Sequence, residues 1–192
     1  MRKKLIFFIA LLLIVAGCSG AGSPVGDVQL RVLTEDYPPF NFVDKDGVVT
    51  GQSTEMVQAI MNEVGIESEI ELLALAEALE LAEKGSGVVL YSLNRTPERE
   101  ELFKWVGPIG DYEQVFYARA GENLAELIKV PAIIIHANLF IALSKDVEDE
   151  VMKAWQKTLD RLKEERDDND KTLIEKFEAK YKDPAYVESL IN

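Results

Sequence analysis

The sequence predicts an α/β fold in which helices flank a largely parallel β-sheet. Segments 28–34, 66–73 and 88–91 have the alternating or continuous apolar patterns that are typical of strands. Segments 56–64 and 75–84 have the apolar spacing of helices and lie between these strands. Strands that alternate with helices form βαβ units, in which neighbouring strands run parallel. We therefore expect one α/β sheet over this half of the chain.

A hairpin is expected after the first strand, because Asp44-Lys-Asp-Gly47 lies between two short apolar stretches. A calcium-binding loop would need glycine at its sixth position, where Val49 stands, so we exclude it. The helix over 56–64 follows this hairpin, and we expect Ser53 or Thr54 to cap its first turn.

The C-terminal part of the chain is predicted to be helical. Residues 147–168 have one apolar face that includes Trp155, which we expect in the core. The acidic run 167–170 is expected to end this helix and to cap a second one. The single histidine, His136, has apolar neighbours and is expected in a turn or in the core.

Composition excludes several classes of function. The chain has 192 residues, 47% of them hydrophobic, and a formal net charge of −13, which argues against nucleic acid as a partner. One cysteine permits no intrachain disulfide, and one histidine makes a zinc site improbable. No nucleophile can be matched to His136 as in a catalytic triad. We expect no cofactor, no metal and no catalytic residue.

The N-terminus has the pattern of a secretory leader over residues 1–17. A basic start precedes the apolar run 5–15, which is too short to span a bilayer and suits a signal peptide. Val15-Ala-Gly-Cys18 resembles the bacterial lipobox, which implies that Cys18 is lipidated and becomes the mature N-terminus. An ordinary signal peptide with an incidental cysteine is the alternative. With lipidation, residues 18–26 would be a flexible tether to the membrane.

The stretch 91–108 contains the strongest candidate for a binding residue. Thr96-Pro-Glu98 has the residues of a helix start, since threonine can cap, proline suits the first position and glutamate suits the dipole. Arg99 then lies in the first turn, where the dipole disfavours a cation, and a bound carboxylate could justify it. The alternative is an arginine that is exposed or paired with the neighbouring glutamates.

Two motifs in this stretch resemble a known family. Ser92-Leu-Asn-Arg-Thr-Pro-Glu-Arg99 and Phe103-Lys-Trp-Val-Gly-Pro108 resemble the extracytoplasmic solute-binding proteins of amino-acid ABC importers, the family 3 or type 2 periplasmic binding proteins. The resemblance covers roughly 28–119 and 139–180. It implies an ABC permease as partner and an amino acid or a similar small carboxylate as ligand, with Arg99 holding the carboxylate. It also implies an extracytoplasmic location.

The resemblance implies further contacts with the ligand. Asn94 and the backbone of Ser92 would supply polar contacts, Tyr37 would stack on the ligand, and Glu35 or Asp36 would receive its amino group. Tyr37, Asn94 and Arg99 all follow strands, and ligands in open α/β sheets bind beyond the carboxyl ends of the strands. These side chains are therefore expected to converge. Three other aromatic side chains are expected in the core rather than at the site: Phe40, Phe42 and Trp105.

The sequence also departs from the family. Leu73-Ala-Leu-Ala76 stands where the family has an aromatic cluster, and Gln52 replaces an aromatic residue. An outgoing hinge strand is expected at 111–119 and a returning strand at 139–146, and of the residues between them only the 17 numbered 121–137 are counted toward a second lobe. One βαβ unit needs about 30 residues, so the second lobe is expected to be truncated. A helix over 123–129 and a strand over 133–135 are expected in what remains.

The predicted organisation has five parts. They are a signal peptide (1–17), a tether (18–26), a solute-binding first lobe (27–119), a remnant of the second lobe (120–138), and a return strand with C-terminal helices that pack on the first lobe (139–192). Two alternatives to solute binding remain. One is a lipoprotein that uses the half-cleft to bind another protein. The other, a dehydratase-type enzyme, would need an enclosed acid that a single lobe hardly provides.

Overall fold

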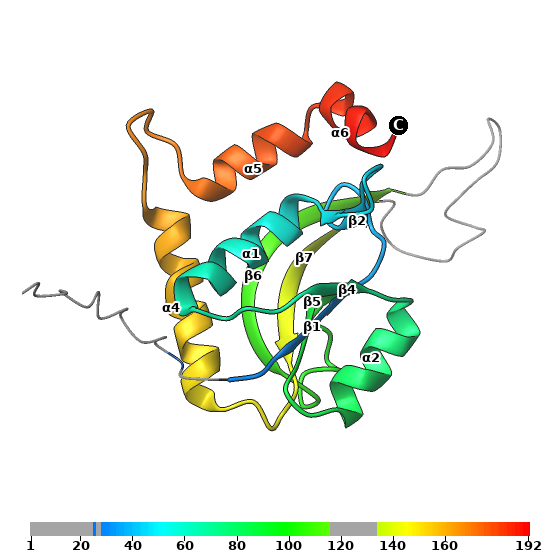
Figure 1. Cartoon of the computed structure of the whole chain (residues 1–192), viewed down its shortest axis with the longest axis vertical. Coiled ribbons are helices and arrows are strands. Elements are labelled where there is room, and N and C mark those ends of the chain that lie inside the picture. Colours follow the sequence, from blue (N-terminus) through cyan, green and yellow to red (C-terminus); the bar gives the residue numbers. More distant parts are fainter. Residues whose placement is uncertain (1–24, 26–27, 116–133) are drawn as a thin grey trace, which may run out of the picture.

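The computed structural model describes Val25, residues 28–115 and residues 134–192. The predicted leader, Cys18, most of the tether and the predicted helix over 123–129 lie outside the described residues. Within them the predicted α/β class with a largely parallel sheet is confirmed, since helices cover both faces of a five-stranded sheet (Figure 1).

The sheet has the strand order β4-β1-β5-β7-β6. Its strands are β1 (Arg31–Thr34), β4 (Ile70–Leu72), β5 (Val88–Asn94), β6 (Lys104–Val115) and β7 (Ile134–Leu143). The strands β4, β1 and β5 run parallel, whereas β7 is antiparallel to both of its neighbours, β5 and β6. Only β7 therefore runs against the common direction of this sheet.

The remaining elements are helices and one small hairpin. The helices are α1 (Gln52–Val64), α2 (Leu75–Lys84), α4 (Asp149–Glu164), α5 (Leu173–Tyr181) and α6 (Pro184–Ile191). The helices α1 and α4 pack on one face of the sheet and α2 packs on the other, so two apolar cores form (Figure 1). None of the described helices has both the length and the apolar content needed to cross a membrane.

The predicted hairpin is confirmed between β2 (Phe42–Val43) and β3 (Val49–Thr50). The Asp44 side chain accepts hydrogen bonds from the N–H groups of Asp46 at 3.0 Å and Val48 at 2.8 Å. Gly47 has φ +83°, a left-handed conformation that glycine adopts without steric cost. The turn was predictable because aspartate and glycine, the residue types at 44 and 47, both favour turns.

The predicted cap of α1 is wrong. The residue before the helix is Gly51, with φ +127° and no capping side chain, while Ser53 and Thr54 are fully buried inside the first turn. The backbone N–H groups of Ser53 and Thr54 donate instead to the carbonyl of Phe40, at 2.9 and 3.3 Å. A Cβ at Gly51 would lie 2.3 Å from that oxygen, so only glycine fits this approach. The sequence does not reveal this because Phe40 is distant along the chain.

The C-terminal helices meet part of the expectation. The break between α4 and α5 is confirmed, but α4 ends at Glu164 and the cap of α5 is Thr172 rather than the acidic run. Thr172 and Glu175 form a reciprocal capping box, with bonds of 2.7 and 3.2 Å. Tyr181 at the end of α5 then donates a hydrogen bond to Glu55 at 2.7 Å, which fastens α5 to α1.

The two predicted hinge strands pair directly with each other. The strands β6 and β7 pair from Lys104 opposite Leu143 to Val115 opposite Ile134, with a shift in register between Val106 and Gly110. Only residues 116–133 separate their ends, in agreement with a truncated second lobe. The expectation for His136 is wrong, because β7 begins earlier than predicted. His136 is exposed on this strand, with Nδ1 3.3 Å from a carboxylate oxygen of Glu113.

Candidate functional site

The carboxyl ends of β1 and β5 position most of the predicted site residues. Glu35 follows β1 directly, Asn94 is the last residue of β5, and Arg99 lies in the loop that follows. Since β1 and β5 are neighbours in the sheet and run parallel, their ends meet at one edge. This is the arrangement in which α/β sheets bind ligands.

The loop that contains Arg99 is not the predicted helix. Residues 97–102 form consecutive turns, in which the N–H of Arg99 donates to the carbonyl of Thr96 and the N–H of Leu102 donates to that of Arg99, both at 3.0 Å. The strand β6 begins at Lys104, so the loop is too short to complete a helix and return to the sheet. The turns hold the backbone of Arg99 beside the end of β5.

Arg99 is half-buried and does not form the salt bridges of the alternative interpretation. Its Nη1 donates to the backbone carbonyl of Asn94 at 3.2 Å. Among the described residues, the guanidinium that pairs with the neighbouring glutamates is that of Arg95, whose Nε lies 2.6 Å from Glu100. Arg95 also lies 5.7 Å from the ring centre of Trp105. Most N–H donors of Arg99 thus make no hydrogen bond to a described residue and could bind an anionic partner.

Glu35 brings a carboxylate to the same place. Partial burial raises the pKa of Glu35 above its ordinary value of 4.5, the positive charge of Arg99 opposes this shift, and Asp36 adds to it. Glu35 and Arg99 follow the neighbouring parallel strands β1 and β5, which places them at the same edge of the sheet. Asp36 is exposed and makes no hydrogen bond to a described residue, so Glu35 is the better placed of the two predicted acids.

Three aromatic rings form one wall of this region. Ring centres are separated by 5.5 Å for Tyr37 and Phe40, 5.9 Å for Tyr37 and Tyr112, and 6.1 Å for Phe40 and Tyr112. The side-chain amide of Asn94 donates to the hydroxyl of Tyr112 at 2.8 Å. Phe42 is buried as predicted, whereas Phe40 and Trp105 are only partly buried. Sequence reasoning missed Tyr112, because its neighbours depend on the order of the strands.

Ser92 in β5 has a left-handed backbone conformation, which is unusual for a serine. It is buried, with φ +62°, at an irregularity in the pairing of β5 with β7 between Tyr91 and Leu93. Its hydroxyl has no hydrogen-bond partner among the described residues. A non-glycine residue in the left-handed region is strained, and such residues cluster at functional sites. The bulge brings Asn94 to the side of the sheet on which Tyr112 lies.

Replacing Glu35 with glutamine is expected to raise the melting temperature at pH 7. The raised pKa means that the fold disfavours the ionised carboxylate, so the wild-type chain loses stability as pH rises through that pKa. Below pH 4.5, Glu35 is protonated in both the folded and the unfolded chain, and the advantage should vanish. Thermal unfolding at pH 7 and pH 4 measures this. Asp36→Asn is the control and should change the melting temperature less; a lower value for Glu35→Gln at pH 7 would contradict the interpretation.

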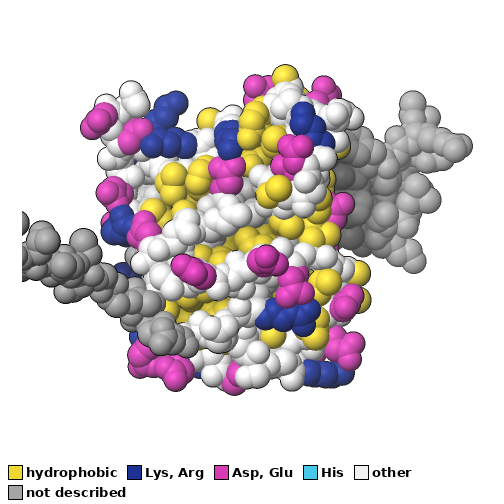
Figure 2. Space-filling model, in the orientation of Figure 1, with side chains coloured by type: hydrophobic (Ala, Val, Ile, Leu, Met, Phe, Trp, Pro, Cys, Tyr) yellow, Lys and Arg dark blue, Asp and Glu magenta, His cyan; other side chains and the backbone are white. Residues whose placement is uncertain are grey.

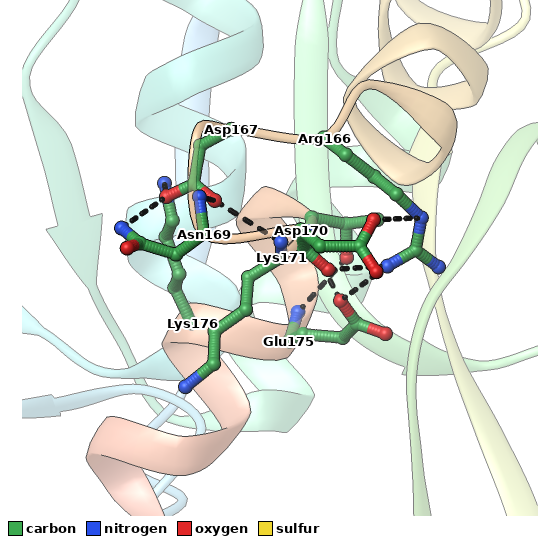
Figure 3. A network of polar contacts seen from close by, with 8 residues as sticks. Arg166, Asp167, Asn169, Asp170, Lys171, Glu175 and Lys176 are labelled. Carbon is green, nitrogen blue, oxygen red and sulfur yellow. Dashed lines mark hydrogen bonds and ion pairs between the residues drawn. The ribbon is translucent and has the colours of Figure 1, made fainter.

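A second polar network lies between α4 and α5 (Figure 3). Asp167 accepts from the N–H groups of Asn169 at 2.9 Å and Lys171 at 3.0 Å, and the ammonium of Lys176 lies 2.7 Å from its carboxylate. The hydrogen bond from Lys176 is the main cause that lowers the pKa of Asp167. Arg166 similarly lies near Glu175, at 3.4 Å. These charges neutralise one another, so the network stabilises the loop and offers little to a ligand.

On the face of the molecule that Figure 2 shows, acidic side chains do not gather in one patch. Figure 2 shows acidic and basic side chains interspersed, with apolar side chains exposed between them. The candidate site is recognised by its own residues, which are Arg99, Glu35, Asn94 and the three aromatic rings.

The sequence of this chain matches a known protein family. The sequence profile described as bacterial extracellular solute-binding proteins, family 3, matches residues 30–177. No curated protein sequence matches the chain.

Solved structures show the same fold. A histidine kinase sensor domain with similarity to periplasmic binding proteins has a TM-score of 0.63 at 16% identity, over 80% of this chain and 96% of that one. An ancestral arginine-binding protein bound to arginine has a TM-score of 0.57 at 16% sequence identity, over 79% of this chain and 97% of that one. The ancestral amino-acid-binding protein AncCDT-1, a precursor of cyclohexadienyl dehydratase, has a TM-score of 0.56 at 19% sequence identity, over 79% of this chain and 94% of that one.

Proposed function

Because this chain belongs to the bacterial extracellular solute-binding proteins of family 3, we propose that it binds an α-amino acid or a similar small carboxylate. The observation that carries the proposal is the half-buried guanidinium of Arg99, which is bonded to the Asn94 carbonyl and whose charge acts on the carboxyl of Glu35, while the Asn94 amide is bonded to Tyr112 of the aromatic wall. A free α-amino acid has one negative and one positive end, and this site offers an opposite charge to each.

Each residue has a separate part in the proposal. Arg99 binds the carboxylate through paired N–H donors, a geometry that a lysine ammonium does not offer. Glu35 accepts from the α-ammonium group, and Tyr37 packs against the body of the ligand. Asn94 acts through Tyr112, since its amide holds the hydroxyl of that ring. Ser92 contributes backbone groups at its bulge.

The truncated second lobe sets the strength of binding. Two-lobed receptors close on a ligand as a hinge and bury about 70–90% of its surface. A single lobe leaves the outer side of the ligand in water, where electrostatic attraction is weaker. We therefore expect weaker binding than in a two-lobed receptor, unless a second molecule covers the site.

The proposed cellular setting is that of an importer. The lipobox-like sequence ending at Cys18 supports a lipid anchor, which would hold the chain at the outer face of a membrane. An ABC permease is the proposed partner, since it would receive the solute. In this role the chain binds without catalysing a reaction.

Calorimetry on residues 25–192 tests the proposal. The titrants are a panel of α-amino acids, and each is paired with the amine that lacks its carboxylate. We expect saturable heat from at least one amino acid and none from its paired amine, because only the former can engage Arg99. If the whole panel gave no heat, solute binding would be refuted in favour of a protein-interaction role.

A further inference from the structure

The end of α5 lies beside the start of α1 (Figure 1), and Tyr181 is the residue that joins them. Within α5, all of which the structure describes, Tyr181 is the one buried residue, with 3% of its surface exposed. Its ring lies edge-on to Phe42, with 6.4 Å between the ring centres, and to Tyr186 at 5.6 Å. The ring is thus packed among aromatic side chains, while the hydroxyl reaches the residues at the start of α1.

The hydroxyl of Tyr181 has three hydrogen-bond partners. It donates to a carboxylate oxygen of Glu55 at 2.7 Å, and it lies 3.2 Å from the backbone nitrogen of Gly51 and 3.0 Å from Oγ1 of Thr50. Since a tyrosine hydroxyl has one proton, which goes to Glu55, it accepts hydrogen bonds from Gly51 and Thr50. Its hydrogen-bonding capacity is therefore used within the fold, and Tyr181 does not itself bind a ligand through its hydroxyl.

The backbone that this hydroxyl holds also holds Phe40. The N–H of Ser53 donates to the carbonyl of Phe40 at 2.9 Å. A Cβ at Gly51 would lie 2.3 Å from the same oxygen, so the chain at Gly51 passes very close to Phe40. Because the hydroxyl of Tyr181 bonds to the N–H of Gly51, it fixes the residue against which the backbone of Phe40 packs.

Phe40 in turn belongs to the aromatic wall of the candidate site. Its N–H donates to the carbonyl of Tyr37 at 2.9 Å. Its ring centre lies 5.5 Å from that of Tyr37 and 6.1 Å from that of Tyr112. A continuous series of printed contacts in the fold thus leads from the hydroxyl of Tyr181 through Gly51 and Phe40 to the wall.

We propose that Tyr181 is a positioning residue for the amino-acid site, which holds Gly51 and thereby keeps the ring of Phe40 in place in the aromatic wall. The inference rests on the proposed function, because it concerns how that same site is held together. Side chains that contact a ligand keep their geometry only when the residues behind them are fixed. Displacement of Phe40 would move the ring of Tyr37, which packs against the body of the ligand in the proposed function.

Replacing Tyr181 with phenylalanine removes the hydroxyl and keeps the ring. We expect affinity for the best amino acid of the panel to fall about 5-fold to 10-fold, the size that one net hydrogen bond supplies. Calorimetry on the full chain in detergent micelles measures the loss. Lys176→Met is the control, since it removes an ion pair of the same helix with Asp167, at 2.7 Å, and should leave affinity within about 2-fold. Unchanged affinity in Tyr181→Phe, or an equal loss in the control, would overturn the proposal.

A second background tests the route through Phe40. In Phe40→Leu the ring on which Tyr181 acts is absent, so adding Tyr181→Phe should weaken binding by no more than about 2-fold further. A general loss of structure would instead produce the same additional loss in both backgrounds. That result would refute the positioning role.

Spectra without ligand separate this inference from the proposed function. With ¹³C-labelled tyrosine, the ring signals of Tyr37 and Tyr112 are identified by their absence when each is replaced with phenylalanine. Tyr181→Phe should shift both signals, and Lys176→Met should shift neither. If no amino acid bound, the proposed function would fail, and these signals alone would decide the inference: shifted signals would support the positioning role, and unshifted signals would refute it.

Discussion

Replacing Arg99 with alanine is expected to weaken amino-acid binding at least about 100-fold, which corresponds to about 2.7 kcal/mol. The guanidinium is held at the end of β5 by its bond to the Asn94 carbonyl, and its other donors make no hydrogen bond within the described part of the chain. Hydrogen bonds to charged groups contribute about 1.5–3 kcal/mol each, and a bidentate carboxylate makes two. Calorimetry with the best ligand of the panel measures the loss.

Two further variants make this result specific. Arg99→Lys keeps the charge but not the planar fork, so binding should fall between that of the wild type and the alanine variant. Arg95→Ala removes a guanidinium from the same loop that is already paired with Glu100 and lies over Trp105. It should leave affinity nearly unchanged. Equal losses for Arg95→Ala and Arg99→Ala would show that the loop, and not the fork of Arg99, supports binding.

Replacing Trp155 with alanine is expected to destabilise the fold by about 3–5 kcal/mol. The side chain is fully buried in α4, within the apolar cluster that α4 shares with α1 and the sheet. Its removal leaves a large cavity that close-packed neighbours fill only in part. The loss is a large share of the stability of a domain of this size. Urea unfolding followed by circular dichroism measures it.

A phenylalanine at the same position is the informative control. The indole Nε1 of Trp155 is buried and has no hydrogen-bond partner among the described residues. Trp155→Phe therefore removes no hydrogen bond and frees the core of an unsatisfied donor, and we expect a cost below about 1.5 kcal/mol. A loss for phenylalanine as large as that for alanine would mean that the N–H group, and not packing, makes Trp155 important.

The regular elements were predictable where local sequence alone decides them. The helix over 75–84 has the predicted bounds, because an apolar stripe begins it and Gly85 stops it. Trp155 was predicted in the core from the same spacing argument. The capping box of α5 also has a local signature, since Thr172 is followed three residues later by Glu175. The acidic run 167–170 lies just before it and led to the wrong cap being predicted.

Features that depend on distant parts of the chain were not predictable. The helix start expected at Thr96 does not form because β6 begins nearby, and the carbonyl of Phe40 takes the place of the cap expected at Ser53 or Thr54. The candidate site shows the same division. Arg99 and Glu35 were predicted as site residues from the sequence motif and from their positions after strands. Tyr112 could not be predicted, because the order of the strands in the sheet brings it to Tyr37.

The bulge at Ser92 determines how this strand would tolerate a change in length. Before it, Tyr91 belongs to the core beneath α1 and Leu90 to the core beneath α2, and after it Leu93 also belongs to the core beneath α2. Ser92 is therefore a surplus residue in the alternation. A natural variant that lacked one residue here would keep Leu93 and Asn94 on their present sides, whereas a variant that lacked two would turn Asn94 away from Tyr112.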